Sequence, residues 1–175
     1  STKAIVREAN AGTKRALVIG NGAYTNATAL PCAVKDARDM ASVLKTLGFT
    51  VRQHTNTTQQ DLENAIREFG KEVKPGDVAL FYYSGHGVQA RGLNYLVPIG
   101  MNAHDEGEIK YKGVPAEMVL DKLEQARSSV NLIVLDACRS NPFKRFKSLN
   151  QGLATMNAPR GTLIAYATAP GTVAL

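Results

Sequence analysis

Short apolar runs alternate with longer amphipathic stretches along most of the chain, and this alternation is the strongest constraint on its fold. Five runs are short, rich in branched or aromatic residues and bounded by Gly, Pro or polar residues, as buried strands are. The expected strands are 16–19, 49–54, 78–83, 131–135 and 162–167. Parallel strands need a crossover between them, which is usually a helix. The sequence therefore predicts an α/β fold: a three-layer sandwich with a mainly parallel β-sheet flanked by helices.

Three amphipathic stretches are the expected helices. The apolar stripe of the first consists of Ala33, Ala37, Met40, Ala41, Leu44 and Leu47. Gly48 follows this stripe as a C-terminal stop. The stripe of the second helix consists of Leu62, Ala65, Ile66 and Phe69. Thr58 precedes it as a good N-cap, and 114–126 is the third expected helix.

The composition is that of an ordinary globular domain. Of the 175 residues, 44% are hydrophobic and 21% are charged, which excludes disordered and collagen-like chains. No apolar run approaches the roughly 20 residues of a membrane helix. Because no repeat or low-complexity linker divides the chain, we expect 1–14 to be a lead-in segment and 15–175 to form one domain.

The charge pattern predicts neither a nucleic-acid nor a membrane partner. The net charge of +6 is spread along the chain, and its one local cluster is Lys144, Arg145 and Lys147. No aromatic residues are interleaved with basic ones in the way that stacks nucleic-acid bases. We interpret the cluster as a solvated loop, and the compartment is left open.

Candidate chemistry gathers beyond the carboxyl ends of the predicted strands, where parallel sheets place their ligands. Segment 84–87 follows the third strand and contains His86, and segment 136–140 follows the fourth and contains Cys138. A thiol needs a nearby base to become the nucleophilic thiolate, and His is the usual choice. The backbone N–H groups of Gly87 and Cys138 could form an oxyanion hole. This set predicts acyl transfer, and specifically peptide hydrolysis.

The order and spacing of four motifs support this reading. His86 precedes Cys138 by 52 residues, close to the interval of about 50 found in caspases. The motifs are Arg15 to Asn21, Tyr83 to Gly87, Leu135 to Arg139 and Ala165 to Gly171. Over 15–175 the chain resembles the caspase-like cysteine peptidases. Within them it is more similar to prokaryotic caspase-like proteins, metacaspases and paracaspases than to animal caspases.

The resemblance implies a caspase-like fold and a Cys–His dyad without a third member. Cys138 would attack the scissile carbonyl, and His86 would act as general acid and base. Metacaspases and paracaspases carry Asp two positions before the nucleophile, as Asp136 does here, and Asp36 matches a second acid of their primary pocket. Two carboxylates would attract a basic side chain, so we expect cleavage after Arg, with Lys second. The expected partners are peptide or protein substrates with basic residues.

The resemblance also bears on processing and on the chain ends. Segment 140–161 occupies the place of the cleavable caspase linker, and self-cleavage there would follow a basic residue. The candidates are Lys144, Arg145, Lys147 and Arg160. In the family another helix and strand follow the 168–171 segment, so 15–175 is expected to hold the larger catalytic part and the start of the smaller one. A C-terminal remainder of the same protein is then an expected partner, activity of this chain alone is doubtful, and the oligomeric state is open.

Metal and redox chemistry receive little support from the sequence. We expect no cofactor and no metal site, because CxxC and HExxH motifs are missing. Calcium activation occurs among metacaspases, but here Asp105, Glu106 and Glu108 alone give only a weak signal for it. Cys32 is expected to be a small buried residue. His54 and His104 are expected on the surface.

Three alternatives stay open at this point. The first is a catalytically silent, caspase-like adaptor or regulatory module, against which the intact His86 and Cys138 argue. The second is a nucleotide-binding domain, suggested by the glycine-rich segment 20–22, although Thr25 stands where a dinucleotide fingerprint needs its third Gly. The third is a serine hydrolase, but no GxSxG motif occurs and Ser84 lies too close to His86 in sequence.

Overall fold

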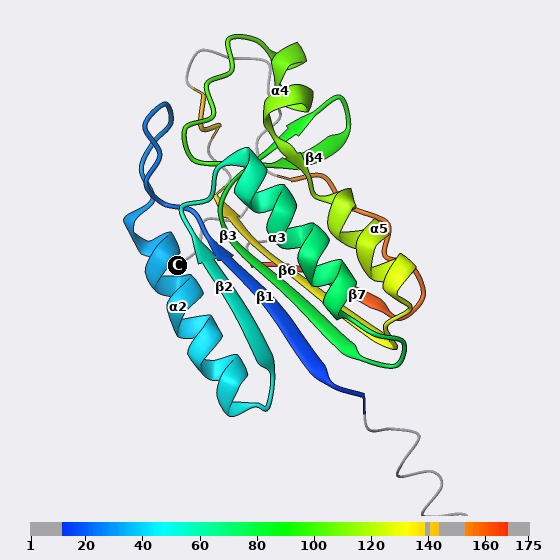
Figure 1. Cartoon of the computed structure of the whole chain (residues 1–175). Coiled ribbons are helices and arrows are strands. Elements are labelled where there is room, and N and C mark those ends of the chain that lie inside the picture. Colours follow the sequence, from blue (N-terminus) through cyan, green and yellow to red (C-terminus); the bar gives the residue numbers. More distant parts are fainter. Residues whose placement is uncertain (1–11, 139–140, 144–152, 168–175) are drawn as a thin grey trace, which may run out of the picture.

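The computed structural model describes residues 12–138, 141–143 and 153–167, with Cys138 described by its backbone. The helices and strands in chain order are β1 (Lys14–Gly20), α2 (Pro31–Thr46), β2 (Thr50–Thr55), α3 (Gln59–Glu72), β3 (Val78–Ala90), β4 (Leu93–Leu96), α4 (Glu106–Lys112), β5 (Val114–Pro115), α5 (Glu117–Ala126), β6 (Val130–Cys138) and β7 (Thr162–Tyr166). Five parallel strands lie in the order β2-β1-β3-β6-β7 (Figure 1). The predicted α/β fold with a mainly parallel sheet is confirmed.

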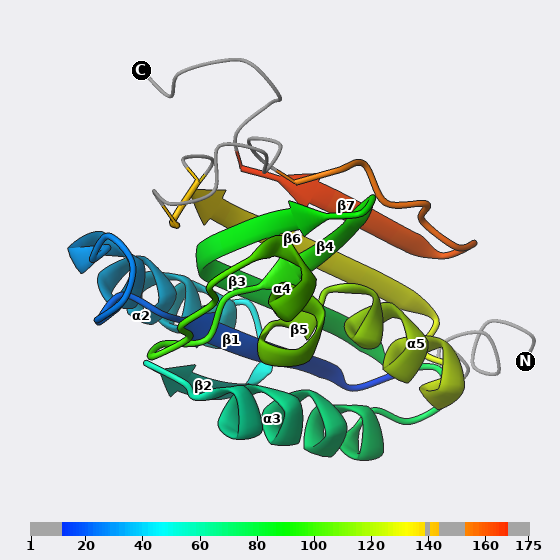
Figure 2. The same cartoon turned by 90° about the horizontal axis from the view of Figure 1, so that it is seen from above.

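Helices cover both faces of this sheet. α2 lies on one face, and α3 and α5 lie on the other (Figure 2). The chain runs outward from β1 to β2 and then crosses back to β3, so two right-handed crossovers in opposite directions place α2 and α3 on opposite faces. The strand order reverses between β1 and β3, and the ends of such strands open the crevice where α/β proteins bind ligands.

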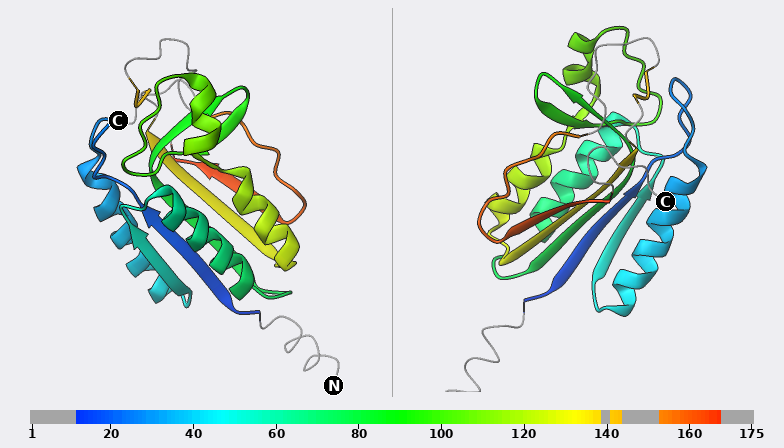
Figure 3. Two further views of the ribbon diagram at one scale, coloured as in Figure 1. Left: turned by 45° about the horizontal axis from the view of Figure 1, so that its top comes forward. Right: turned by 180° about the vertical axis from the view of Figure 1, so that it is seen from behind.

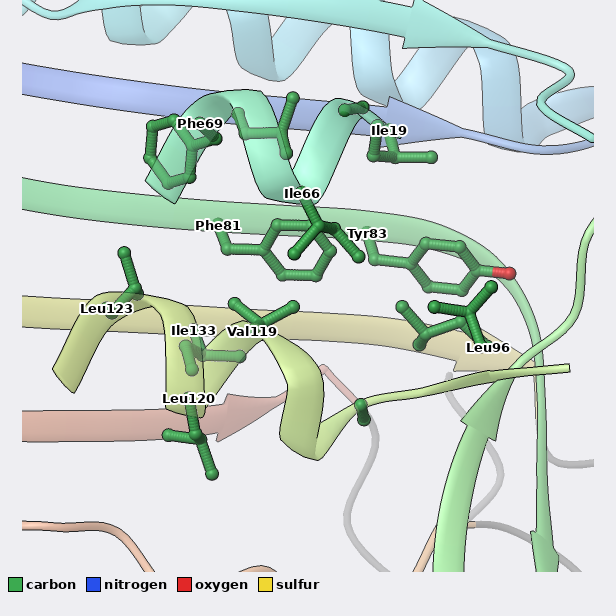
Figure 4. Close-up of a cluster of buried hydrophobic side chains, with 14 of the residues drawn as sticks. Ile19, Ile66, Phe69, Phe81, Tyr83, Leu96, Val119, Leu120, Leu123 and Ile133 are labelled. Atoms are coloured by element: carbon green, nitrogen blue, oxygen red, sulfur yellow. The ribbon is translucent and has the colours of Figure 1, made fainter. Parts of the chain in front are cut away.

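The face under α3 and α5 carries the larger hydrophobic core. Phe81 and Tyr83 of β3 lie on the face that α3 and α5 cover, in one cluster with Ile66 of α3, Leu123 of α5 and Ile133 of β6 (Figure 4). All five side chains are almost completely buried. This core makes β3 and β6 the rigid centre of the molecule, and the candidate dyad lies at their carboxyl ends.

The helix ends follow the predicted signals. Thr58 caps α3 in a capping box: its side chain accepts from the N–H of Asp61, whose carboxylate accepts from the N–H of Thr58. Gly48 follows α2 with a φ of 86°, which disfavours other residues. The stripe of α2 is buried at Ala33, Ala37, Ala41 and Leu44. Leu47 caps the helix and is exposed, which differs from the prediction.

The structure also contains elements that the sequence pattern did not predict. β3 continues seven residues past the expected strand and turns at Arg91 and Gly92 into β4. Both turn residues have positive φ, as a two-residue hairpin requires. α4 and β5 were likewise not expected. The third long helix was predicted to begin at Val114, but this residue pairs with Leu96 in β5, and α5 begins at Glu117.

The α2 face of the sheet is covered unevenly. Viewed from behind, α2 lies over β1 and β2, whereas β7 has no helix in front of it (Figure 3). Leu163 of β7 pairs with Leu132 of β6 and is 62% exposed. Among the described residues, no helix has both the length and the hydrophobicity needed to span a bilayer.

Candidate active site

His86 and Cys138 occupy equivalent positions on neighbouring parallel strands. The register of β3 and β6 pairs Ser84 with Asp136 and His86 with Cys138. Hydrogen-bonded strands lie about 4.8 Å apart, so the backbones of the two candidate residues are direct neighbours. They were expected in loops beyond the strands. Instead both strands extend through them, which fixes the pair on the sheet itself.

The His86 side chain is buried and held through one of its two ring nitrogens. Nε2 lies 2.7 Å from the carbonyl oxygen of Thr28, in the segment that joins β1 to α2. A carbonyl oxygen can only accept, so Nε2 carries the proton and Nδ1 has the free lone pair. Nδ1 is buried and hydrogen-bonds to no atom of the described residues. Burial lowers the pKa of His86, and the Thr28 carbonyl offsets this only in part.

Two buried tyrosines hold the backbone of His86. The N–H of His86 donates to Tyr24 Oη at 2.9 Å, and Tyr83 Oη donates to the His86 carbonyl at 2.7 Å. Tyr24 Oη in turn donates to the carbonyl of Val97 at 2.9 Å. The Tyr24 ring also lies against the imidazole, with centroids 4.6 Å apart. The position of the imidazole is therefore fixed by four partners: Thr28, Tyr24, Tyr83 and the sheet.

The two glycines beside His86 lie where a larger residue would meet close neighbours. A Cβ on Gly85 would lie 2.6 Å from Tyr83 Oη and 2.9 Å from Tyr24 Oη, where the tyrosines bind the backbone. A Cβ on Gly87 would lie 2.8 Å from Leu153 Cδ2. No side chain fits at either position without displacing these neighbours. The oxyanion-hole role of the Gly87 and Cys138 N–H groups stays a prediction.

The two candidate pocket acids lie near a common tyrosine. Tyr82 Oη donates to Asp136 Oδ2 at 3.3 Å. Burial raises the pKa of Tyr82, and the negative charges of Asp136 and then Asp36 raise it further. Both carboxylates therefore raise the pKa of the same phenol, although Asp36 belongs to α2 and Asp136 to β6. Both residues are half-buried. Sequence reasoning missed Tyr82, although it shares its strand face with Ser84, which pairs with Asp136.

The glycine-rich turn after β1 has its donors already occupied. The N–H groups of Gly22 and Ala23 both donate to Asn56 Oδ1 at 3.0 Å, and the N–H of Asn21 donates to the Ser84 carbonyl. A phosphate would have to displace these partners. The geometry of the turn therefore disfavours the nucleotide-binding alternative.

The remaining predicted residues lie apart from this group. Cys32 is exposed, so its predicted burial is wrong: it lies one residue before the buried Ala33 and is turned away from the sheet by the helical period. Lys144, Arg145 and Lys147 lie outside the described residues. Arg160 is exposed, just before β7. It lies at the amino ends of the parallel strands, whereas Cys138 lies at the carboxyl end of β6. Seven strand residues at about 3.3 Å each separate the two ends by about 23 Å.

The acidic residues considered for calcium support the short helix α4. Asp105 caps this helix by accepting from the N–H of Glu108. The Glu108 carboxylate accepts from the N–H of His104 and from Lys112 Nζ. His104 and His54 are exposed, as predicted. Among the residues in the described ranges, no group of three or more His, Cys, Asp or Glu side chains is placed to hold a metal ion.

Comparisons with known proteins give relatives in animals, a protozoan and a bacterium. The chain is 28% identical to human mucosa-associated lymphoid tissue lymphoma translocation protein 1 over 126 residues, which are 72% of this chain and 15% of that protein. It is 33% identical to metacaspase-2 of Trypanosoma brucei brucei over 92 residues, 45% of this chain and 26% of the relative. It is 28% identical to a probable protease of a Desulfuromonadales bacterium, covering 91% of this chain and 23% of that protein. The chain thus spans about a quarter or less of the length of these relatives.

A solved structure and a family model complete the comparison. The crystal structure of a Geobacter sulfurreducens protein matches with a TM-score of 0.58 at 21% identity, covering 74% of this chain and 52% of that one, which shows a shared fold. The family model described as a caspase domain matches residues 13–175, a range that includes the paired His86 and Cys138. The chain therefore belongs to the caspase-domain family of peptidases.

Proposed function

We propose that this chain is a cysteine endopeptidase that cleaves after Arg or Lys, with Cys138 as the nucleophile and His86 as general acid and base. The observation that carries the proposal is the pairing of His86 with Cys138 across β3 and β6. The fixed tautomer supports it, because the Thr28 carbonyl occupies Nε2 and leaves the lone pair of Nδ1 for a proton from the thiol.

The reaction would proceed in two balanced halves. His86 Nδ1 takes the thiol proton, the Cys138 sulfur bonds to the substrate carbonyl carbon, and the C–N bond breaks as Nδ1 returns the proton to the leaving amine. In the second half Nδ1 takes a proton from water, the hydroxide bonds to the carbonyl carbon, the C–S bond breaks as Nδ1 returns the proton to the Cys138 sulfur, and the acid product leaves. Thr28 would keep the imidazole oriented and stabilise its charged form. The N–H groups of Gly87 and Cys138 would bind the oxyanion.

Preference for a basic residue is supported by the acids around Tyr82. Asp36 and Asp136 lie near the Tyr82 phenol and come from different elements. Tyr82 donates a hydrogen bond to Asp136, so it helps to hold this carboxylate in place for a cation. A guanidinium can engage carboxylates with two parallel hydrogen bonds, whereas an ammonium binds as a point charge. We therefore expect Arg to be preferred over Lys, and an acidic residue to be rejected.

The test is hydrolysis of paired fluorogenic peptides that differ only in Arg, Lys or Asp before the scissile bond. The wild-type chain, Cys138→Ala, and a longer chain that continues past Leu175 should be compared, with and without calcium. Cys138→Ala should lower kcat/KM by at least about a thousandfold, because the nucleophile is lost. Its melting temperature should stay within a few degrees of wild type, because the change in volume is small. Retained turnover would refute Cys138 as the nucleophile, and inactivity of all forms would favour the adaptor.

Thiol labelling gives a second readout that does not require turnover. Cys32 is exposed and would react with any alkylating reagent, so the labelling has to be done in a Cys32→Ser background. There, a basic peptide aldehyde should protect the remaining thiol against iodoacetamide, whereas an acidic peptide aldehyde should not. Equal protection by both would contradict the acidic pocket.

Self-cleavage would depend on which basic residue is cut. Arg160 lies at the amino ends of the strands and Cys138 at the carboxyl end of β6, so cutting at Arg160 would require a second molecule. Its rate should then rise with protein concentration, and a first-order rate would contradict this expectation.

A further inference from the structure

The chain that follows the candidate nucleophile comes back to the site from behind. Leu153 lies 15 positions after Cys138 in the sequence, and its side chain packs against the large hydrophobic core under α3 and α5. There it meets Gly87, the residue after His86. A Cβ at Gly87 would lie 2.8 Å from Leu153 Cδ2 and 3.4 Å from Leu153 Cγ. The Leu153 side chain therefore lies against the backbone of the strand that carries His86.

The same place adjoins the strand that carries Cys138. Ala137 is the residue before Cys138, and its Cβ is 3.1 Å from the point where a Cβ of Gly87 would lie. Ala137 and Leu153 thus fill the space beside Gly87 together. Because the register pairs residue 86 with residue 138, this space lies directly behind the two paired backbones.

Leu153 packs on the side of the sheet away from the imidazole. Successive residues of a strand point to opposite faces, so the His86 side chain and the Cβ position of Gly87 face opposite ways. The imidazole lies against the Tyr24 ring, whereas Leu153 packs against the core that contains Leu96. Leu153 can therefore influence the position of His86 from the face opposite the imidazole.

A buried amide holds the chain next to Leu153. Asn94 Nδ2 donates to the carbonyl of Ala154 at 2.7 Å, and the N–H of Ala154 donates to Asn94 Oδ1 at 2.7 Å. Asn94 lies on β4 and is completely buried. Its amide thus binds Ala154 through both a donor and an acceptor, as a paired strand would. Tyr166 Oη also bonds this segment, but Ala154 keeps both Asn94 bonds without it.

The position of the two strand ends matters for the proposed reaction. Proton transfer from the thiol requires the imidazole within hydrogen-bond reach, and a displacement of about 1 Å can lower a rate about a hundredfold. β6 ends at Cys138. The end of a strand is held by fewer backbone hydrogen bonds than its centre, so packing from behind contributes more to the position of the chain there.

We infer that Leu153 is a positioning residue: held in place through Asn94, it supports β3 and β6 from behind and keeps His86 and Cys138 at reacting distance. This inference rests on the proposed function and adds to it the side chain that sets the geometry of the dyad. Because Leu153 acts through His86, its loss should affect kcat and the reactivity of the thiol, and leave KM unchanged.

The experiment measures alkylation of the Cys138 thiol by iodoacetamide at pH 7, in a Cys32→Ser background. This rate depends on removal of the thiol proton and does not require turnover. His86→Ala should lower it about tenfold and Leu153→Ala about fivefold, because both weaken the base. If Leu153 acts through His86, the double variant should react within about twofold of His86→Ala alone. The rates of the two single variants would otherwise multiply.

Peptide hydrolysis gives the second readout. Leu153→Ala should lower kcat for the Arg peptide about tenfold at constant KM, because the loss is in geometry and not in binding. Leu153→Met keeps most of the volume and should restore both kcat and the alkylation rate to within about twofold of wild type. If Leu153→Ala fails to fold, the smaller truncation Leu153→Val replaces it in both measurements.

Ile164→Ala is the matched control. Ile164 is also half-buried and packs against the same core, but it lies on β7 and pairs with Ile133, five residues before Cys138. Its truncation should cost a similar free energy of unfolding in urea and leave the alkylation rate and kcat unchanged. Equal slowing by Ile164→Ala and Leu153→Ala, no slowing by Leu153→Ala, or multiplying effects with His86→Ala would each overturn the inference alone. Full alkylation and hydrolysis rates in His86→Ala would overturn the proposed dyad and the inference with it.

Discussion

The two ends of the parallel sheet each bury an ionisable side chain, and they treat it differently. At the amino ends, Asp77 accepts from the N–H of Lys74 at 2.8 Å, from Arg15 Nε at 3.0 Å and from the N–H of Thr13 at 3.0 Å. At the carboxyl ends, His86 has one ring nitrogen bound and the other without a partner among the described residues. A buried group with all its partners holds the fold together, whereas one that keeps a free lone pair is available for chemistry.

The pKa values of the two groups express the same difference. Burial alone would raise the pKa of Asp77, but the Lys74 N–H, the Arg15 guanidinium and the Thr13 N–H outweigh it and leave the pKa below its ordinary value. For His86 burial prevails over the Thr28 carbonyl, and the pKa falls. The fold therefore favours the charged form of Asp77 and the neutral form of His86.

Among the changes that test this comparison, the largest expected effect is on stability at the amino end. Asp77→Ala should cost about 3 kcal/mol of the free energy of unfolding, because it leaves the Arg15 charge and two backbone N–H groups without their partner. Urea unfolding monitored by circular dichroism measures this loss. Asp39→Ala is the matched control, because its pair with Lys35 is exposed and should contribute little. Equal losses of unfolding free energy in both variants would contradict a special stabilising role for Asp77.

A change in the pocket should alter substrate preference more than stability. Asp136→Asn should lower kcat/KM for the Arg peptide about thirtyfold, roughly 2 kcal/mol, because a charge partner of the guanidinium is lost. The amide oxygen can still accept from Tyr82, so the melting temperature should change little. Asp36→Asn tests the second acid in the same way. An unchanged ranking of Arg, Lys and neutral peptides in both variants would count against the pocket.

The tyrosine that binds the His86 N–H should show a smaller effect on turnover. Tyr24→Phe keeps the ring against the imidazole but removes the acceptor for this N–H and the donor to Val97. We expect kcat to fall about fivefold at constant KM, because only the position of the imidazole is loosened. Tyr166→Phe makes the same change on a hydroxyl that bonds backbone groups of 154 and 156, and should leave kcat unchanged. A rise in KM without a loss of kcat would contradict a positioning role.

The smallest effect is in the pH dependence. Because burial lowers the pKa of His86, the acid limb of kcat/KM should lie below the ordinary value of 6.5. Below that pH the unfolded chain binds a proton that the folded chain does not, so His86 should also make stability fall as the pH drops. Replacing the exposed His54 and His104 by Asn should leave the limb in place. An apparent pKa above 6.5 would contradict a buried neutral base.

Much of the fold could be predicted because local pattern and global packing agree. The five parallel strands and three long helices follow from apolar periodicity, and Thr58 and Gly48 mark helix ends as their chemistry requires. The short hairpin strand β4, the helix α4 and β5 could not be predicted, because strands of two or four residues and a helix of seven have too few positions to show a period. Cys32 was misplaced because its residue type favours burial, whereas its position lies outside the apolar stripe that begins at Ala33.

For the site, the sequence by itself determined the chemical types and their order: His86 before Cys138, with Asp136 two residues before the thiol. Only the tertiary structure decided how they meet. The register of β3 and β6 pairs His86 with Cys138, a carbonyl from a distant loop selects the tautomer of His86, and Tyr24 holds its backbone. These contacts join residues 52 to 62 positions apart. Such contacts depend on the crossing of strands and the packing of loops, which no local pattern of residues encodes.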